Sequence, residues 1–240
     1  MSEHISRKEL KQDKIKETIE HGAEAVLSHG QFAGILVAVV LAVAIGYGGW
    51  RFYIEHQTAQ ASVGFESAMK AYKGRIGAAP DPADPSEPVY ADEKARAQDA
   101  LSKLTKLADA YPSTNPGKLA RYYAALCLED LDRQNQALEE LKRVRASGDK
   151  ELADLAQYQM AVIYARTGKP DDAAKNFREL AEKRSIFVPR ALALLELGNV
   201  LRQSNPKEAA NVYQQIKKEF PDTPSSEQAD RGLELLAPKS

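Results

Sequence analysis

The chain has 240 residues, of which 43% are hydrophobic and 28% are charged, and this composition is sufficient for a globular core. The 33 basic and 34 acidic residues leave a formal net charge of -1, so no overall positive charge favours nucleic acid. The single cysteine, Cys127, excludes an intramolecular disulfide and a cysteine-based zinc site.

Candidate catalytic and metal-ligating residues are scarce. All four histidines occur at or before His56, so the remaining chain lacks the residues for a Ser-His-Asp triad, a Cys-His pair or a common histidine metal site. Paired acids such as Glu139–Glu140 and Asp171–Asp172 occur among polar residues that are typical of a solvated helix surface. We therefore expect no enzyme activity, no cofactor, no metal and no small-molecule substrate.

The first 31 residues form a mixed-charge tail, in which lysine and glutamate alternate between Lys8 and Glu20. This alternation is typical of a charged surface helix, although a docking role for the tail remains open.

Residues 32–50 form an uncharged apolar run, FAGILVAVVLAVAIGYGGW. A helix of this length, at about 1.5 Å per residue, spans the hydrocarbon core of about 30 Å of a bilayer. Arg51, Phe52 and Tyr53 follow as an interfacial anchor. A cleavable signal peptide is the alternative, but its apolar core would be shorter, and the cleavage-like triplet Ala59–Ala61 is far beyond the run. We predict a retained single-pass transmembrane helix.

Orientation depends on positive charge, and the counts closest to the helix are equal on its two sides. The tail as a whole carries five basic residues, Arg7, Lys8, Lys11, Lys14 and Lys16. Because long domains translocate largely regardless of their charge, we expect the tail to stay in the cytoplasm and the following domain to lie outside.

Small residues recur at every fourth position of this helix, at Gly34, Ala38, Ala42 and Gly46. A face of this kind allows another backbone to approach closely, so it is a candidate packing face for a partner membrane helix. The alternative is that alanine and glycine are simply common in membrane helices.

Residues 51–73 are predicted to form a juxtamembrane helix, and residues 74–91 a proline-rich loop. Residues 92–240 then contain a repeat: Ala137, Ala173 and Ala209 are 36 residues apart, and each is followed four residues later by a bulky residue. A small residue lets the second helix of a hairpin approach its neighbours, and the bulky residue fills the gap.

The repeat resembles the tetratricopeptide pattern, whose small, aromatic, glycine, alanine and aromatic positions occur in one copy as Ala161, Tyr164, Gly168, Ala173 and Phe177. Other copies depart from this pattern, because the repeats contain no tryptophan and Leu128 and Leu201 replace the tyrosine. We predict an all-α fold: one transmembrane helix followed by a tetratricopeptide-like α-solenoid of about three to four helical hairpins.

In such a solenoid the first helix of each hairpin lines the concave surface. The predicted lining, a candidate protein-binding groove, is Leu119, Tyr122, Leu126, Leu155, Tyr158, Val162, Leu192, Leu195 and Asn199. Tetratricopeptide domains that clamp a carboxylate use Lys, Arg and Asn here, and only Asn199 fits, so the groove suits an extended apolar segment or an amphipathic helix. Alternatively, the proline-rich loop or the last helix fills the groove. We expect Cys127 to be buried and unreactive.

The whole order of segments is similar to the ancillary Sec-translocon subunit family, also called YfgM-like proteins. The stretch within residues 118–180, which begins KLARYYAALCLEDL, resembles the central repeats of that family. The resemblance implies a bacterial inner-membrane protein with a cytoplasmic N-terminus and a periplasmic repeat domain. It also implies a position near the Sec translocon and contact with periplasmic chaperones or unfolded clients.

Two hypotheses for function follow. In the first, the chain is a membrane-anchored scaffold for protein–protein interaction that is accessory to protein export or periplasmic chaperoning. In the second, it is a structural accessory subunit of another membrane complex, and its repeats serve only as a packing surface.

Overall fold

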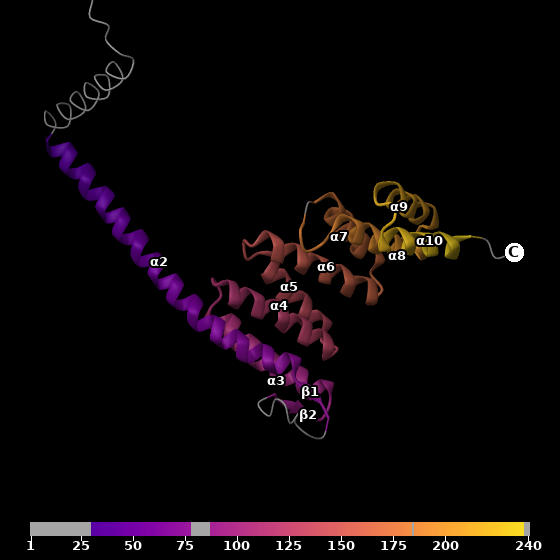
Figure 1. Ribbon diagram of the computed structural model, residues 1–240, viewed down its shortest axis with the longest axis horizontal. Helices are drawn as coiled ribbons and strands as arrows, with labels where there is room; N and C mark the ends of the chain where they lie inside the picture. Colours follow the sequence, from indigo (N-terminus) through magenta and orange to yellow (C-terminus); the bar gives the residue numbers. More distant parts are fainter. Residues whose placement is uncertain (1–29, 78–86, 184, 238–240) are drawn as a thin grey trace, which may run out of the picture. The chain divides into compact units, whose positions relative to one another are not determined.

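The computed structural model describes residues 30–77, 87–183 and 185–237, and the tail predicted for residues 1–31 falls almost wholly outside them. The chain divides into two compact units at His56 and Gln57. The helices are α2 (Gly30–Lys73), α3 (Glu93–Ala110), α4 (Asn115–Asp130), α5 (Gln134–Arg145), α6 (Lys150–Arg166), α7 (Pro170–Glu182), α8 (Arg190–Ser204), α9 (Pro206–Glu219) and α10 (Pro224–Leu236), shown in Figure 1. The predicted all-α fold, with an apolar helix and a helical-repeat solenoid, is confirmed.

The first unit contains the apolar part of α2. Large hydrophobic side chains from Ile35 to Tyr53 are exposed. Within the described residues, α2 is the one helix that is long and apolar enough to cross a bilayer, and none of its apolar stretch is buried by protein. A Cβ added at Gly34 or Gly46 would meet no atom within 4 Å, and Ala38 and Ala42 are exposed, so no described residue of the first unit covers the small-residue face.

The second unit begins inside α2, earlier than residue 92, where the sequence placed the start of the repeats. Ala61, Ala68 and Ala71 are buried in one core cluster with Leu104 and Leu107 of α3. Small side chains allow this close packing, since a Cβ at Gly64 would lie 2.7 Å from a methyl group of Leu107. The sequence predicts a juxtamembrane helix over residues 51–73, and in the structure Gln57–Lys73 is also the first helix of a hairpin.

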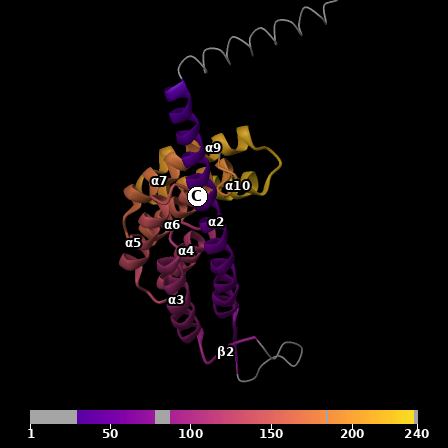
Figure 2. The same ribbon diagram turned by 90° about the vertical axis from the view of Figure 1, so that its left-hand side faces the viewer.

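Four hairpins result: the Gln57–Lys73 part of α2 packs on α3 through the shared core, and α4–α5, α6–α7 and α8–α9 follow, with α10 as an additional helix packed on α8 and α9. From α3 to α10 each helix contacts the next along the chain, and Figure 2 shows α3 to α7 from a second side. The repeat alanines Ala137, Ala173 and Ala209 are 0% exposed, as the spacing predicts. Their bulky partners Leu141, Phe177 and Tyr213 fill the interior between successive hairpins.

The proline-rich connection between α2 and α3 is paired at its two ends. Strand β1 (Arg75–Ile76) lies parallel to strand β2 (Val89–Tyr90), with Arg75 opposite Val89. The Tyr90 hydroxyl donates a hydrogen bond to Asp99 Oδ2 of α3 at 2.6 Å. These contacts fix the connection to the first hairpin at the points where it leaves α2 and enters α3.

Threonine side chains start two of the helices. Thr114 and Thr223 each donate a hydrogen bond to the carbonyl three residues earlier, at Tyr111 and Phe220. Each also accepts one from the amide three residues later, so the aromatic-proline sequence that ends one hairpin leads directly into the N-cap of the next. Asp92 and Asp149 cap α3 and α6, because each side chain accepts a hydrogen bond from the amide three residues later.

Candidate protein-binding groove

The predicted groove residues come from α4, α6 and α8, the first helices of three hairpins. Seven of the nine are partly exposed: Leu119, Tyr122, Leu126, Leu155, Tyr158, Val162 and Leu192. Leu195 is only 4% exposed and belongs to the core cluster that includes α9 and α10 residues. Leu195 therefore lies in the interior of the solenoid and not on the exposed surface of the groove. Asn199 is exposed, and its Oδ1 accepts a hydrogen bond from the Tyr213 hydroxyl at 2.9 Å.

An aromatic cluster forms the α2–α4 end of the groove. Tyr122 and Tyr123 have ring centroids 5.7 Å apart, and Tyr72 of α2 lies 5.1 Å from Tyr123 in an edge-to-face arrangement. Phe65 of α2 lies 6.0 Å from the same Tyr123 ring. Sequence reasoning missed Phe65, Tyr72 and Tyr123, because it assigned the first two to the juxtamembrane helix, outside the repeat domain. Their helical spacing next to buried alanines was the available signal.

Burial raises the pKa of the Tyr122 phenol to about 12, and the neighbouring Tyr123 and Tyr72 contribute next. The phenol therefore stays protonated at physiological pH and remains a hydrogen-bond donor. It combines an apolar ring with a polar tip in a partly dry environment, which is the property that makes tyrosine frequent at protein interfaces.

Tyr158 occupies the equivalent position on α6. Its ring packs edge-on against Phe177 of α7, with centroids 5.6 Å apart. Burial raises its pKa, and the negative charge of Glu196 on α8 raises it further. Tyr158 thus connects the apolar groove to a carboxylate on the next hairpin.

A polar bridge joins α4 and α6. Gln159 Nε2 donates to both carboxylate oxygens of Glu129, at 2.9 and 3.0 Å, and Arg166 Nη1 lies 3.2 Å from Oε1 of the same carboxylate. The charge of Glu129 is therefore neutralised within the protein, and it is not available to bind a partner as a free anion.

A hollow of about 390 Å³ lies between the end of α6, the start of α7 and the second half of α8. It is lined by Ala165, Gly168, Pro170, Glu196, Asn199, Val200, Gln203 and Ser204. Glu196 thus contributes to the hollow and also lies beside Tyr158 of the groove.

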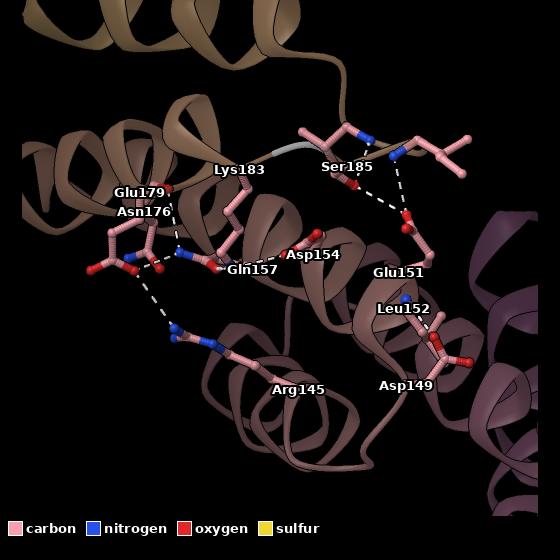
Figure 3. A network of polar contacts seen from close by, with 12 residues as sticks. Arg145, Asp149, Glu151, Leu152, Asp154, Gln157, Asn176, Glu179, Lys183 and Ser185 are labelled. Carbon is pink, nitrogen blue, oxygen red and sulfur yellow. Dashed lines mark hydrogen bonds and ion pairs between the residues drawn. The ribbon is translucent and has the colours of Figure 1, made fainter.

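Figure 3 shows the polar contacts that hold α6 against α7 and the loop after it. Lys183 Nζ donates to Asp154 Oδ1 and to Gln157 Oε1, both at 2.7 Å. Gln157, which is 0% exposed, donates in turn to Glu179 of α7 at 2.8 Å. These bonds satisfy the buried polar atoms of α6 and so fix the helix that carries Tyr158.

The same loop presents two large apolar side chains. Glu151 Oε2 accepts hydrogen bonds from the Ser185 hydroxyl at 3.3 Å and from the Ile186 amide at 3.1 Å. Val188 is buried, whereas Ile186 and Phe187 are 79% and 57% exposed.

Two expectations for the groove concern its neighbours. The last helix, α10, packs on α8 and α9, so it does not fill the groove over α4 and α6. Residues 78–86 of the proline-rich loop are outside the described residues, so filling by that loop stays a prediction.

Cys127 is 0% exposed, and burial raises the pKa of its thiol to about 12, which leaves almost no thiolate at neutral pH.

Residues 27–192, more than half of the chain, match the model of the family described as tetratricopeptide repeat-like domain. The chain belongs to this tetratricopeptide repeat-like domain family. Residues 192–223, which contain most of the α8–α9 hairpin, match a second model, described as tetratricopeptide repeat. Repeats of this kind form protein-interaction scaffolds, and nothing in the comparisons indicates an enzyme. No curated protein matches the chain.

A solved structure has the same fold as this tetratricopeptide-like chain. It is a protein of Podosopora anserina described as a kinesin light chain with nearly identical TPR-like repeats. The TM-score is 0.51 at 13% sequence identity, and the match covers 75% of this chain and 94% of the other. At this identity the likeness establishes the solenoid fold alone.

Proposed function

We propose that the chain is a membrane-anchored scaffold for protein–protein interaction, accessory to protein export or periplasmic chaperoning at the bacterial inner membrane. The observation that carries this proposal is the apolar, tyrosine-bearing groove over α4 and α6, in which Tyr122, Leu126, Leu155, Tyr158 and Val162 remain partly exposed. Such a surface suits an extended apolar segment of a client or a partner chaperone.

The apolar helix supports the anchored arrangement. It is long enough to span a bilayer, and its small-residue face is left uncovered by the described residues of the first unit. The resemblance of the segment order and of residues 118–180 to YfgM-like proteins supports a position near the Sec translocon, with the tail in the cytoplasm and the repeats in the periplasm.

The competing proposal is a structural subunit of another membrane complex. The observation that favours it is the small-residue face at Gly34, Ala38, Ala42 and Gly46, which no other described residue of the first unit covers and which could hold the chain against one fixed membrane partner.

Site-specific photocrosslinking in cells separates the two proposals. A photoreactive phenylalanine derivative is placed at Val162 in the groove, at Ala42 in the apolar helix, or at Lys175, an exposed position on α7 that serves as the control. We expect Val162 to crosslink to newly exported chains or periplasmic chaperones, Ala42 to translocon components and Lys175 to neither. Crosslinks from all three positions to subunits of one unrelated complex would overturn the export proposal and support the structural one.

A further inference from the structure

Partly buried carboxylates of the solenoid include some that are paired with a cation and others, such as Glu151, that accept hydrogen bonds only from neutral groups. Glu129, Glu140, Asp154 and Glu179 are each paired with an arginine or a lysine. Glu196 forms no ion pair with any basic residue among those that the structure describes, although it lies on a concave helix between a tyrosine and a hollow. The neutral phenol of Tyr158 hydrogen-bonds to this carboxylate, and the carboxylate oxygens can accept further hydrogen bonds from a cationic ligand.

The hollow beside Glu196 has the lining that a cationic side chain requires. Its polar groups are one carboxylate, the amides Asn199 and Gln203 and the hydroxyl Ser204, and no lysine or arginine is among the lining residues. Lys169, which stands between two lining residues in the sequence, places its Nζ over the Tyr164 ring, 5.9 Å from the centroid. The remaining walls, including Val200 and Pro170, can pack against an aliphatic side-chain stem.

We propose that this hollow binds a lysine or arginine side chain of a partner segment whose apolar residues lie along the groove of Tyr122 and Tyr158. The inference rests on the proposed function, since it specifies the chemistry of the segment that the groove receives. The ammonium or guanidinium group donates to the Glu196 carboxylate, and the amide oxygens of the lining accept the remaining hydrogen bonds. Recognition then requires apolar residues for the groove and one cation at a fixed distance from them.

Binding of synthetic peptides to the full-length protein in lipid nanodiscs tests this inference. The peptides share a background of leucine, phenylalanine and alanine, and a single lysine is scanned through every position. Each lysine peptide is compared with one that carries norleucine or glutamate at that position. Because a charge-assisted hydrogen bond contributes more than a neutral one, we expect lysine to improve the Kd about tenfold over norleucine at one or two positions, and glutamate to weaken binding.

The variant Glu196→Gln keeps the shape of the side chain and removes its charge, so it should abolish the preference for lysine while leaving binding of the norleucine peptide unchanged. Glu234→Gln, at an exposed position of α10, removes the same charge away from the hollow and should retain the preference. Thermal melting of both variants should match that of the unsubstituted protein, which excludes unfolding as the cause.

Equal affinity for lysine and norleucine peptides at every position, or a lysine preference that survives Glu196→Gln, would overturn the inference. If Tyr122→Ala still weakened the binding of all peptides in that case, the groove would remain a binding site, but one without a pocket for a cation. Absence of binding by every peptide would overturn both the inference and the groove on which the proposed function rests.

Discussion

Tyr213 illustrates how single residues determine the spacing of the hairpins. Its ring is 0% exposed and lies between two glycines: a Cβ at Gly198 of α8 or at Gly232 of α10 would approach the ring carbons to 2.5 Å. The ring cannot move away from one glycine without approaching the other. The 36-residue spacing predicts the alternation of small and bulky residues. The contact between Tyr213 and Gly232 could not be predicted in this way, because it depends on where α10 lies in the structure.

Substitution Gly198→Ala tests this fit. Overpacking costs about 1–3 kcal/mol, which exceeds the gain of about 1 kcal/mol in helix propensity, so we expect net destabilisation of roughly 1 kcal/mol. In a Tyr213→Leu background the added methyl group finds space, and the same substitution should stabilise. Urea denaturation of the four proteins in this double-mutant cycle measures the difference. Equal effects of Gly198→Ala in both backgrounds would show that the ring and the glycine are not in tight contact.

The choice of groove residues was predictable in part. Tyr122 and Tyr158 occupy equivalent repeat positions, and both are partly exposed on first helices. Leu195 has the same repeat position but is buried in the core cluster of the last hairpins, and its spacing in the sequence does not distinguish it from Tyr122 and Tyr158. Glu196 was not predicted as a site residue, because sequence spacing does not show which carboxylates acquire a cation in three dimensions.

At the scale of elements, polar contacts between helices fix positions that apolar packing alone would leave free to slide. Lys183, Asp154 and Gln157 connect the end of α7 to α6, and Arg121 of α4 bonds to Asp109 of α3 and to Glu140 of α5. Each bridge joins residues of different helices, and none was apparent from the sequence.

Replacing Lys183 by methionine retains the aliphatic stem and removes the cation. The Asp154 side chain is 12% exposed, so its carboxylate would remain in a mostly dry site without a partner. We expect destabilisation of about 1–3 kcal/mol. Lys175→Met, at an exposed position on α7 in no ion pair, should change stability by less than about 0.5 kcal/mol. Chemical denaturation followed by circular dichroism compares the two, and similar midpoints would mean that the network contributes nothing measurable.

At the scale of the whole molecule, the order of an apolar helix followed by helical repeats could be predicted, because hydrophobic length and repeat spacing are both visible in the sequence. The residue at which the solenoid starts could not be predicted. The proline-rich connection interrupts the 36-residue spacing, so Gln57–Lys73 has no copy at the expected distance, although its buried alanines pack on α3.

Two truncated chains test this boundary. The fragment of residues 57–237 retains the complete first hairpin and should unfold in one cooperative transition. The fragment of residues 92–237 exposes Leu104, Leu107 and the ring of Tyr123, so we expect a loss of about 2–5 kcal/mol, comparable to that of large core truncations. Differential scanning calorimetry of both fragments provides the measurement. Identical melting temperatures of the two fragments would show that Gln57–Lys73 does not stabilise the repeat domain, and the domain would then start at residue 92.

The fit of Tyr213 between two glycines also limits how this repeat array can change during evolution. Copying the α8–α9 hairpin to a position before α6 would place Tyr213 against Ala161, whose methyl group occupies the space that Gly232 leaves open. The hairpins are therefore not interchangeable modules, although they share one backbone plan. Duplication or shuffling of a hairpin within this array would require a compensating substitution in the neighbouring copy. We therefore expect the array to lengthen only when a duplicated hairpin is accompanied by such a substitution.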